Sequence, residues 1–227
     1  MLIFQVLLAL LAYSPFLVVS APQALWAADG TNLAPKNPGN LSDKFLPASA
    51  MYSGSWSNFP AMSTWTSFDN MFNANLQSMF VAGSTQQDVD HIRIAVTSVA
   101  AAYGIDERVL FGIIMEESHG GVGVVNTHDA DGSATGGLMQ ASGCQGYQGQ
   151  NNLAQADITL MVDCGTQQLK TNLANWGGQN LEQSVYPALP AFNSGSVLAW
   201  DLSTAPNGVG NPTYVIDIAQ RLQGWTN

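Results

Sequence analysis

Apolar residues recur at helical spacing from Ser84 onward. The first such run begins with Thr85 and has Asp88 three residues later, a pair typical of a capping box at a helix start. Gly104 follows the run, and glycine commonly ends helices. The pattern therefore predicts a helix between Thr85 and Gly104, with an inward stripe made of Val89, Ile92, Val96 and Val99.

A second apolar stripe follows Asp106, which is placed to cap the next helix. Its members fall at i, i+1, i+4 and i+5 and are Val109, Leu110, Ile113 and Ile114. Glu117 lies four residues after Ile113, so it projects from the same inward face. A carboxyl held against apolar side chains has a raised pKa and can act as a general acid. The alternative is that Glu116 and Glu117 are two solvated residues at a helix end.

The rest of the chain also favours a mainly α fold. Two further helices are predicted near 153–162 and 166–176, and the last one begins at Asn211-Pro212 and ends at Gly224. The glycine-rich stretch 119–136 is poorly suited to a long helix.

The N-terminal third has a different composition. Residues 22–50 contain several prolines and are expected to form a flexible leader to the domain. Residues 56–80 carry so many aromatic and methionine side chains that we expect them to pack on the helical core. The alternative for Trp56 or Trp65 is to stack on a carbohydrate.

The first residues of the chain are almost wholly apolar. The run from Leu2 to Val19 is followed by the small residues Ser20-Ala21, which suit cleavage of a signal peptide after Ser20. A retained membrane anchor is the alternative. We therefore expect a secreted, extracellular protein with no stable membrane association, divided into a signal peptide (1–20), an N-terminal extension (21–83) and a helical domain (84–227).

Charge argues against one class of partner. The chain has 16 acidic and 6 basic residues, a formal net charge of −10, and no stripe of Lys or Arg that could displace the counterions of phosphates. Nucleic acid is therefore not expected as a partner.

The two cysteines, Cys144 and Cys164, predict one disulfide in an exported chain, whereas two buried free thiols are the alternative. The three histidines, His91, His119 and His128, do not have the spacing of a zinc site. No metal and no cofactor are expected.

Three segments of the helical domain resemble one known family. The first is a central motif, made of the run from Phe111 to Gly120 that contains Glu117 and the stretch from Thr135 to Gln140 with Gly-Leu-Met-Gln. The other two are Ala191 to Val197 and Tyr214 to Leu222. In this order they resemble goose-type lysozymes and lytic transglycosylases (SLT domain), glycoside hydrolase family 23, and in particular its secreted fungal members. The resemblance covers about residues 84–227. It implies a lysozyme-like helical domain of the α+β class, with a small sheet or irregular lip at the active-site cleft.

The resemblance also implies roles for individual residues. Glu117 would be the catalytic acid. Ser118, Gln140, Phe192 and Asn193 would bind the substrate, with Ser118 supporting the site through hydrogen bonds. Phe192 stands where the family usually has Tyr, which removes a hydroxyl near the site. Two prolines are expected to interrupt the helix before it, Pro187 and Pro190.

Asp131 is the candidate for a second catalytic carboxylate. It lies six residues before Gly137, where goose-type lysozymes resemble this chain in carrying an aspartate that orients water. Those enzymes have another acid at the position of Ser142, so a two-aspartate arrangement is not complete here. The alternative for Asp131 is a turn residue, since Asp-Gly is common in turns.

The expected activity is cleavage of β-1,4 bonds in peptidoglycan by a monomeric enzyme, through hydrolysis or lytic transglycosylation. Bacterial walls are polyanions and would repel an acidic protein at neutral pH, so either the enzyme works in acid or its polymer is neutral, like chitin. A glycan-binding or cell-surface protein without catalysis on the same scaffold is the alternative from another class.

Overall fold

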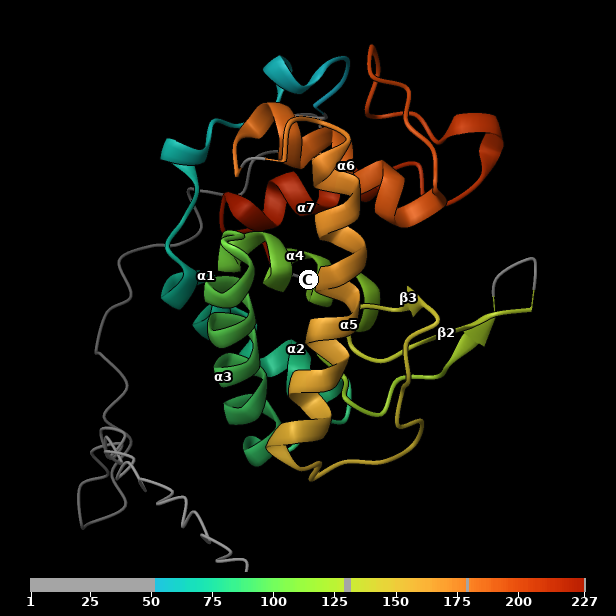
Figure 1. Cartoon of the computed structure of the whole chain (residues 1–227). Helices are drawn as coiled ribbons and strands as arrows, with labels where there is room; N and C mark the ends of the chain where they lie inside the picture. Colours follow the sequence, from blue (N-terminus) through green and yellow to red (C-terminus); the bar gives the residue numbers. More distant parts are fainter. Residues whose placement is uncertain (1–51, 129–131, 179, 227) are drawn as a thin grey trace, which may run out of the picture. The chain divides into compact units, whose positions relative to one another are not determined.

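The described part of this computed structural model is built mainly from helices (Figure 1). It covers residues 52–128, 132–178 and 180–226, so the predicted signal peptide and Asp131 lie outside it. The α-helices are α1 (Phe68–Ala74), α2 (Leu76–Val81), α3 (Gln86–Tyr103), α4 (Glu107–Ser118), α5 (Gln155–Ala174), α6 (Glu182–Ser194) and α7 (Tyr214–Leu222). Within the described ranges, no helix is both long and apolar enough to cross a bilayer.

The predicted starts of α3 and α4 are confirmed. The Thr85 hydroxyl accepts a hydrogen bond from the Asp88 amide while the Asp88 carboxylate accepts one from the Thr85 amide, which completes a capping box. Gly104 ends α3 in the left-handed region. Asp106 caps α4 by accepting a hydrogen bond from the amide of Arg108.

Asp88 also fastens a distant loop to α3. Its fully buried carboxylate accepts hydrogen bonds from the amides of Asn152 and Leu153, at 2.9 and 2.8 Å, in addition to those from Thr85. Burial alone raises the pKa of this carboxyl, but the bonds from Thr85, Asn152 and Leu153 outweigh burial and lower the pKa below its ordinary value. Asp88 therefore stabilises the fold as an anion, and this stabilisation is lost as the pH falls through the lowered pKa.

We expect Asp88→Asn to lower the free energy of unfolding by about 2 to 3 kcal/mol at pH 6, because an amide nitrogen would replace one acceptor facing buried N–H groups. Urea denaturation of parent and variant measures the difference. Asp90→Asn, an exposed change on the same helix, is the matched control. Equal stabilities of the two variants would contradict the role assigned to Asp88.

Three short strands form the only sheet within the described residues. They are β1 (Thr127–His128), β2 (Ala134–Gly136) and β3 (Ala141–Ser142), joined in the order β1-β2-β3. Both pairs are antiparallel, with Thr127 opposite Thr135 and Gly136 opposite Ala141. A mainly helical α+β fold with a small sheet is thus confirmed.

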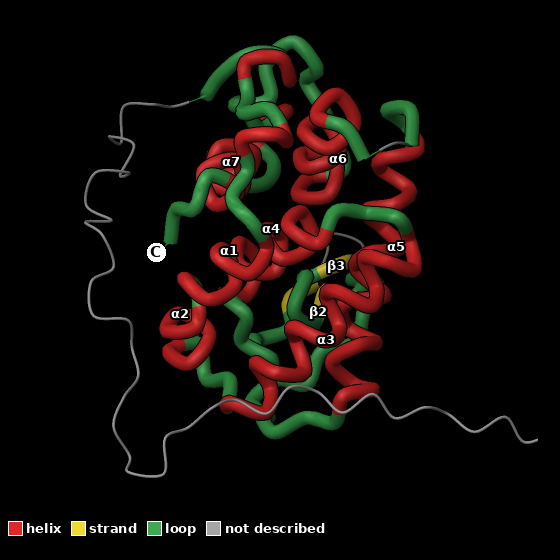
Figure 2. The backbone as a smooth tube through the Cα atoms, turned by 90° about the vertical axis from the view of Figure 1, so that its left-hand side faces the viewer, coloured by secondary structure: helices red, strands yellow, loops and turns green. Residues whose placement is uncertain are grey.

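The core forms around α4. Every residue from Val109 to Met115 is buried, and α4 packs against α7, α3 and α1. The long helices α3 and α5 lie side by side, and β3 lies beside α5 (Figures 1 and 2). The end of α4 that carries Glu117 therefore emerges from the interior of the domain.

One long helix replaces the two that the sequence predicted near 153–162 and 166–176. Gly165 lies between the two predicted ranges, but α5 runs through it without interruption. A Cβ at Gly165 would lie 2.6 Å from the Cβ of Met139, so glycine lets the β2–β3 turn pack directly against the helix. This tertiary contact offsets the cost of about 1 kcal/mol that glycine imposes on a helix.

Two predictions about the last helices were also wrong. Pro187 and Pro190 do not interrupt α6, because both are buried within it and their packing offsets the hydrogen bonds that proline cannot donate. Helix α7 begins at Tyr214, because the side-chain oxygen of Asn211 accepts bonds from the amide and hydroxyl of Thr213 and holds residues 211–213 in a turn.

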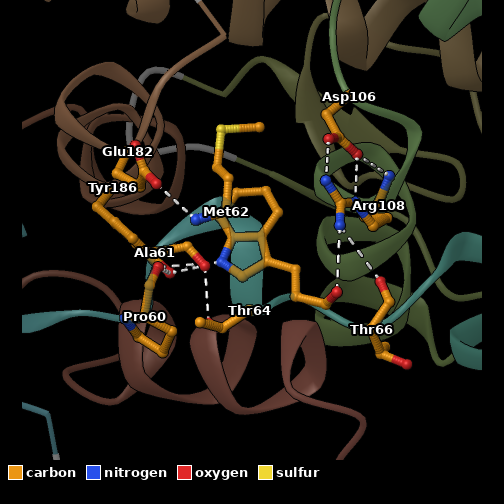
Figure 3. Close-up of polar contacts among 10 residues, drawn as sticks. Pro60, Ala61, Met62, Thr64, Thr66, Asp106, Arg108, Glu182 and Tyr186 are labelled. Carbon is orange, nitrogen blue, oxygen red and sulfur yellow. Dashed lines mark hydrogen bonds and ion pairs between the residues drawn. The ribbon is translucent and has the colours of Figure 1, made fainter.

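The described part of the N-terminal stretch, residues 52–81, belongs to the same compact unit as the later helices. Phe59, Phe68, Met71, Phe72 and Met79 are buried in the common core. Figure 3 shows how the segment before α1 is fastened to α4 and α6 by polar contacts, which involve Pro60, Met62, Trp65, Thr66, Arg108, Glu182 and Tyr186.

The two tryptophans considered for sugar stacking have different environments. Trp65 is only 6% exposed, and its indole N–H is bonded to the Tyr186 hydroxyl and the Pro60 carbonyl. Trp56 is 40% exposed. Trp65 therefore packs in the core, and only Trp56 presents a large part of its ring to solvent.

Candidate functional site

Glu116 and Glu117 stand at the point where α4 leaves the core. They follow the wholly buried run Val109–Met115, and both are partly exposed. His119 ends the helix in a left-handed conformation with φ 50°, which turns the chain sharply after Ser118. Both side chains therefore lie at the boundary between the core and solvent.

Tyr214 is the direct partner of Glu117. Its hydroxyl donates a hydrogen bond of 2.7 Å to Oε1 of Glu117, and the tyrosine, at the start of α7, is itself only 3% exposed. This places a neutral donor on one oxygen of the carboxyl and leaves Oε2 without a hydrogen bond in the described contacts.

The surroundings of Glu117 favour its protonated form. Burial raises its pKa, the bond from Tyr214 lowers it in part, and the neighbouring Glu116 raises it again, so that the pKa reaches about 7. Glu117 therefore holds a proton at mildly acidic pH, where an ordinary glutamate would be ionised. A protonated carboxyl that reaches solvent can donate its proton to a bound molecule.

Glu116 is held differently. Its Oε2 accepts from Nε of Arg221 at 3.1 Å, and its Oε1 accepts from Nδ2 of Asn211 at 3.3 Å. Arg221 is 1% exposed and lies over the ring of Trp225. The picture of two solvated glutamates at a helix end is therefore wrong, because each carboxyl has a specific partner from α7.

Ser118 joins α4 to the β2–β3 turn. Its hydroxyl lies 2.8 Å from the carbonyl of Leu138 and 3.0 Å from that of Ile114, and it accepts from the amide of Gly120 at 3.2 Å. The side chain is buried. These contacts favour the supporting role expected for Ser118 and leave its hydroxyl turned away from any ligand in solvent.

Gln140 closes the same turn. Its backbone is left-handed, with φ 43°, and its side-chain Nε2 donates to the Gly137 carbonyl at 2.9 Å. The side chain is partly exposed. Strained backbone of this kind, here at Gln140 and His119, costs free energy and is often found at functional sites.

Phe192 and Asn193 differ in their surroundings from what the resemblance implied. Phe192 is only 6% exposed and belongs to the core cluster, which favours packing over contact with a substrate. The amide of Asn193 exchanges two hydrogen bonds with the backbone of Asn211, at 3.1 and 3.2 Å. Asn193 thus closes the base of the loop between α6 and α7, just before Tyr214.

The predicted disulfide is confirmed. Cys144, two residues after β3, is bonded to Cys164 in α5. It joins the segment after β3 to α5, the longest described helix. Among the described residues, no three His, Cys, Asp or Glu side chains gather closely enough to hold a metal ion.

Three residues of this arrangement were not predicted as site residues from the sequence: Tyr214, Asn211 and Arg221. All lie about 100 positions after the glutamates that they contact, and only their place at the start and along one face of the last helix could have suggested them.

The chain matches no model of a known protein family, and it matches no curated protein either.

Proposed function

We propose that the protein is a lysozyme-like secreted glycosidase that cleaves β-1,4 bonds between amino sugars in peptidoglycan, with Glu117 as the general acid. The observation that carries the proposal is the state of Glu117: a partly exposed carboxyl with a pKa of about 7, bonded to a buried tyrosine. The resemblance of three segments to family 23 enzymes adds the substrate class.

In this reaction Glu117 donates its proton to the glycosidic oxygen while the bond from that oxygen to the sugar breaks. The positive charge that develops on the sugar ring is then captured by water or by a hydroxyl of the same sugar. Water gives hydrolysis, and the internal hydroxyl gives an anhydro sugar. Capture by the internal hydroxyl needs no second carboxylate. For hydrolysis, Asp131 is the candidate for the carboxylate that orients the water.

Chitin is the second candidate substrate, because the net charge of −10 disfavours association with an anionic wall at neutral pH. Mass spectrometry of the products from purified peptidoglycan and from chitin oligomers would report both the polymer and the chemistry. We expect disaccharide-peptide products from peptidoglycan, with or without loss of one water. Absence of new products from both substrates at pH 5 would refute the proposal.

The raised pKa predicts the pH dependence of the activity. Because only protonated Glu117 can act as the acid, kcat/KM should fall about tenfold per pH unit above about pH 7 and be highest at about pH 4 to 6. A series of initial rates on one soluble glycan oligomer from pH 3 to 9 measures this limb. A rate that still rises above about pH 8 would contradict the role of Glu117 as an acid.

A further inference from the structure

The two neighbouring carboxyls of α4 are each held by a different kind of partner from α7. Tyr214, at the start of α7, contacts Glu117, and Arg221, seven residues later, contacts Glu116. Residues seven apart lie on the same face of a helix, two turns from each other. Side chains from one face of α7 therefore form hydrogen bonds with both carboxyls.

The two partners favour opposite states of protonation. Arg221 is a cation that stabilises an ionised Glu116, and the amide N–H of Asn211 donates to the other oxygen of the same group. Glu117 has only a neutral hydroxyl as its donor. The charge of Glu116 acts on Glu117, and two carboxyls that interact in this way resist being ionised together. The group with the better donors therefore takes the charge and the other keeps its proton.

We propose that Glu116 is a positioning residue whose ionised carboxylate, held by Arg221 and Asn211, keeps the neighbouring Glu117 protonated and ready to act as the acid. This inference rests on the proposed function for its consequence in catalysis. Its physical content, that the charge of Glu116 controls the proton of Glu117, can be tested without any substrate.

Other charged groups near the pair do not replace Glu116 in this role. The pKa of Glu116 is itself raised above its ordinary value, chiefly by burial, which Arg221 opposes and to which Asp217 of α7 adds. His119, at the end of α4, has a lowered pKa because of burial and of the nearby Arg221, which favours the neutral ring. Among the described residues, Glu116 is the charged group that raises the pKa of Glu117.

A competing account is that Arg221 acts directly on Glu117. The guanidinium would then stabilise ionised Glu117, and its removal would raise the pKa of Glu117. The proposal predicts the opposite. Without Arg221 the charge on Glu116 is less stable, Glu116 holds its own proton to higher pH, and Glu117 loses the repulsion that keeps it protonated.

The test uses the full-length protein without substrate. The chain contains four glutamates, Glu107, Glu116, Glu117 and Glu182, so labelling glutamate side-chain carboxyls with ¹³C gives four NMR signals. The Glu117→Gln variant assigns the signal of interest. Titration from pH 3 to 9 then reports the pKa of Glu117 in each variant, and the position of the alkaline limb of kcat/KM provides the catalytic readout.

We expect Glu116→Gln to lower the pKa of Glu117 by about one unit, as removal of a nearby charge at an effective dielectric constant of about 20 would do. Arg221→Gln should lower it as well. Tyr214→Phe should raise it, because it removes a donor that favours the ionised form. Glu107→Gln, the same substitution at the other end of α4, is the matched control and should leave it unchanged.

A Glu117 pKa that stays the same or rises in folded Glu116→Gln would overturn the proposal. Circular dichroism and unchanged signals of Glu107 and Glu182 show that the variant is folded. If it does not fold, Arg221→Gln decides, because a raised Glu117 pKa there supports direct action of the cation. A parent protein that cleaves neither polymer would refute the proposed function and leave the titration result standing.

Discussion

Glu117→Gln should reduce turnover of the polymer by a factor of about 10² to 10⁴, the contribution typical of general acid catalysis. Glutamine has nearly the same shape and can still accept the hydrogen bond from Tyr214, so the fold should be retained. What the variant lacks is a proton that can be donated. Initial rates at pH 5, with circular dichroism as the check on folding, measure the effect.

The matched control is again Glu107→Gln, which changes the same residue type on the same helix away from the site and should keep the parent activity.

The Glu117→Gln substitution should also change the stability of the fold. Because the folded protein raises the pKa of Glu117 from 4.5 to about 7, this group lowers the stability of the fold as the pH rises from about 4.5, and the loss is complete above about pH 7. The Glu117→Gln variant should therefore be more stable than the parent at pH 8, by roughly 1 to 2 kcal/mol after allowance for its partial exposure. At pH 4 the two should be equal.

Comparable activity of the Glu117→Gln and parent proteins on the true substrate would remove the enzyme assignment. Equal stability of the two proteins at pH 8 would show instead that the carboxyl is not held in its protonated form. The two measurements thus separate an error about the reaction from an error about the electrostatics of the site.

Removing the disulfide with Cys144→Ser and Cys164→Ser should lower the free energy of unfolding by about 2 to 5 kcal/mol, since the bridge closes a loop of 20 residues. The bridge also fixes the segment just after β3 against α5, and β3 directly follows the β2–β3 turn. That turn contains Leu138, whose carbonyl contacts Ser118 next to Glu117. We therefore expect lower activity even at temperatures at which the variant remains folded.

Urea denaturation and activity assays at a low temperature measure the two effects separately. Titration of free thiols in the denatured, unreduced secreted protein should find none. Two free thiols per chain would show that the bridge does not form in the protein as made. A variant that loses stability but keeps full activity would show that the bridge does not position the site.

The placement of Glu117 could be predicted from the sequence because it depends on local periodicity. Four apolar residues at helical spacing after the Asp106 cap fix which face of α4 is buried, and Glu117 falls on that face. The capping box of α3 and the pairing of two cysteines are also local or combinatorial features, and both are confirmed.

The tertiary structure decided what surrounds that glutamate. Two separate helices were predicted on either side of Gly165, and a break was predicted at Pro187 and Pro190. Contacts with Met139 and with the core outweighed these local preferences in α5 and α6. No local pattern links Glu117 to Tyr214, which lies 97 residues later, because the contact exists only where α7 packs on α4.

Tertiary packing of α7 on α4 also gives the two glutamates different surroundings. By sequence alone Glu116 and Glu117 are adjacent, identical side chains, and only their angular positions on the helix distinguish them. Packing of α7 gives one of them a guanidinium and the other a phenol. The sequence by itself determined that a carboxyl would stand at the edge of the core, whereas the partners that set its protonation come from a helix that only tertiary packing brings to it.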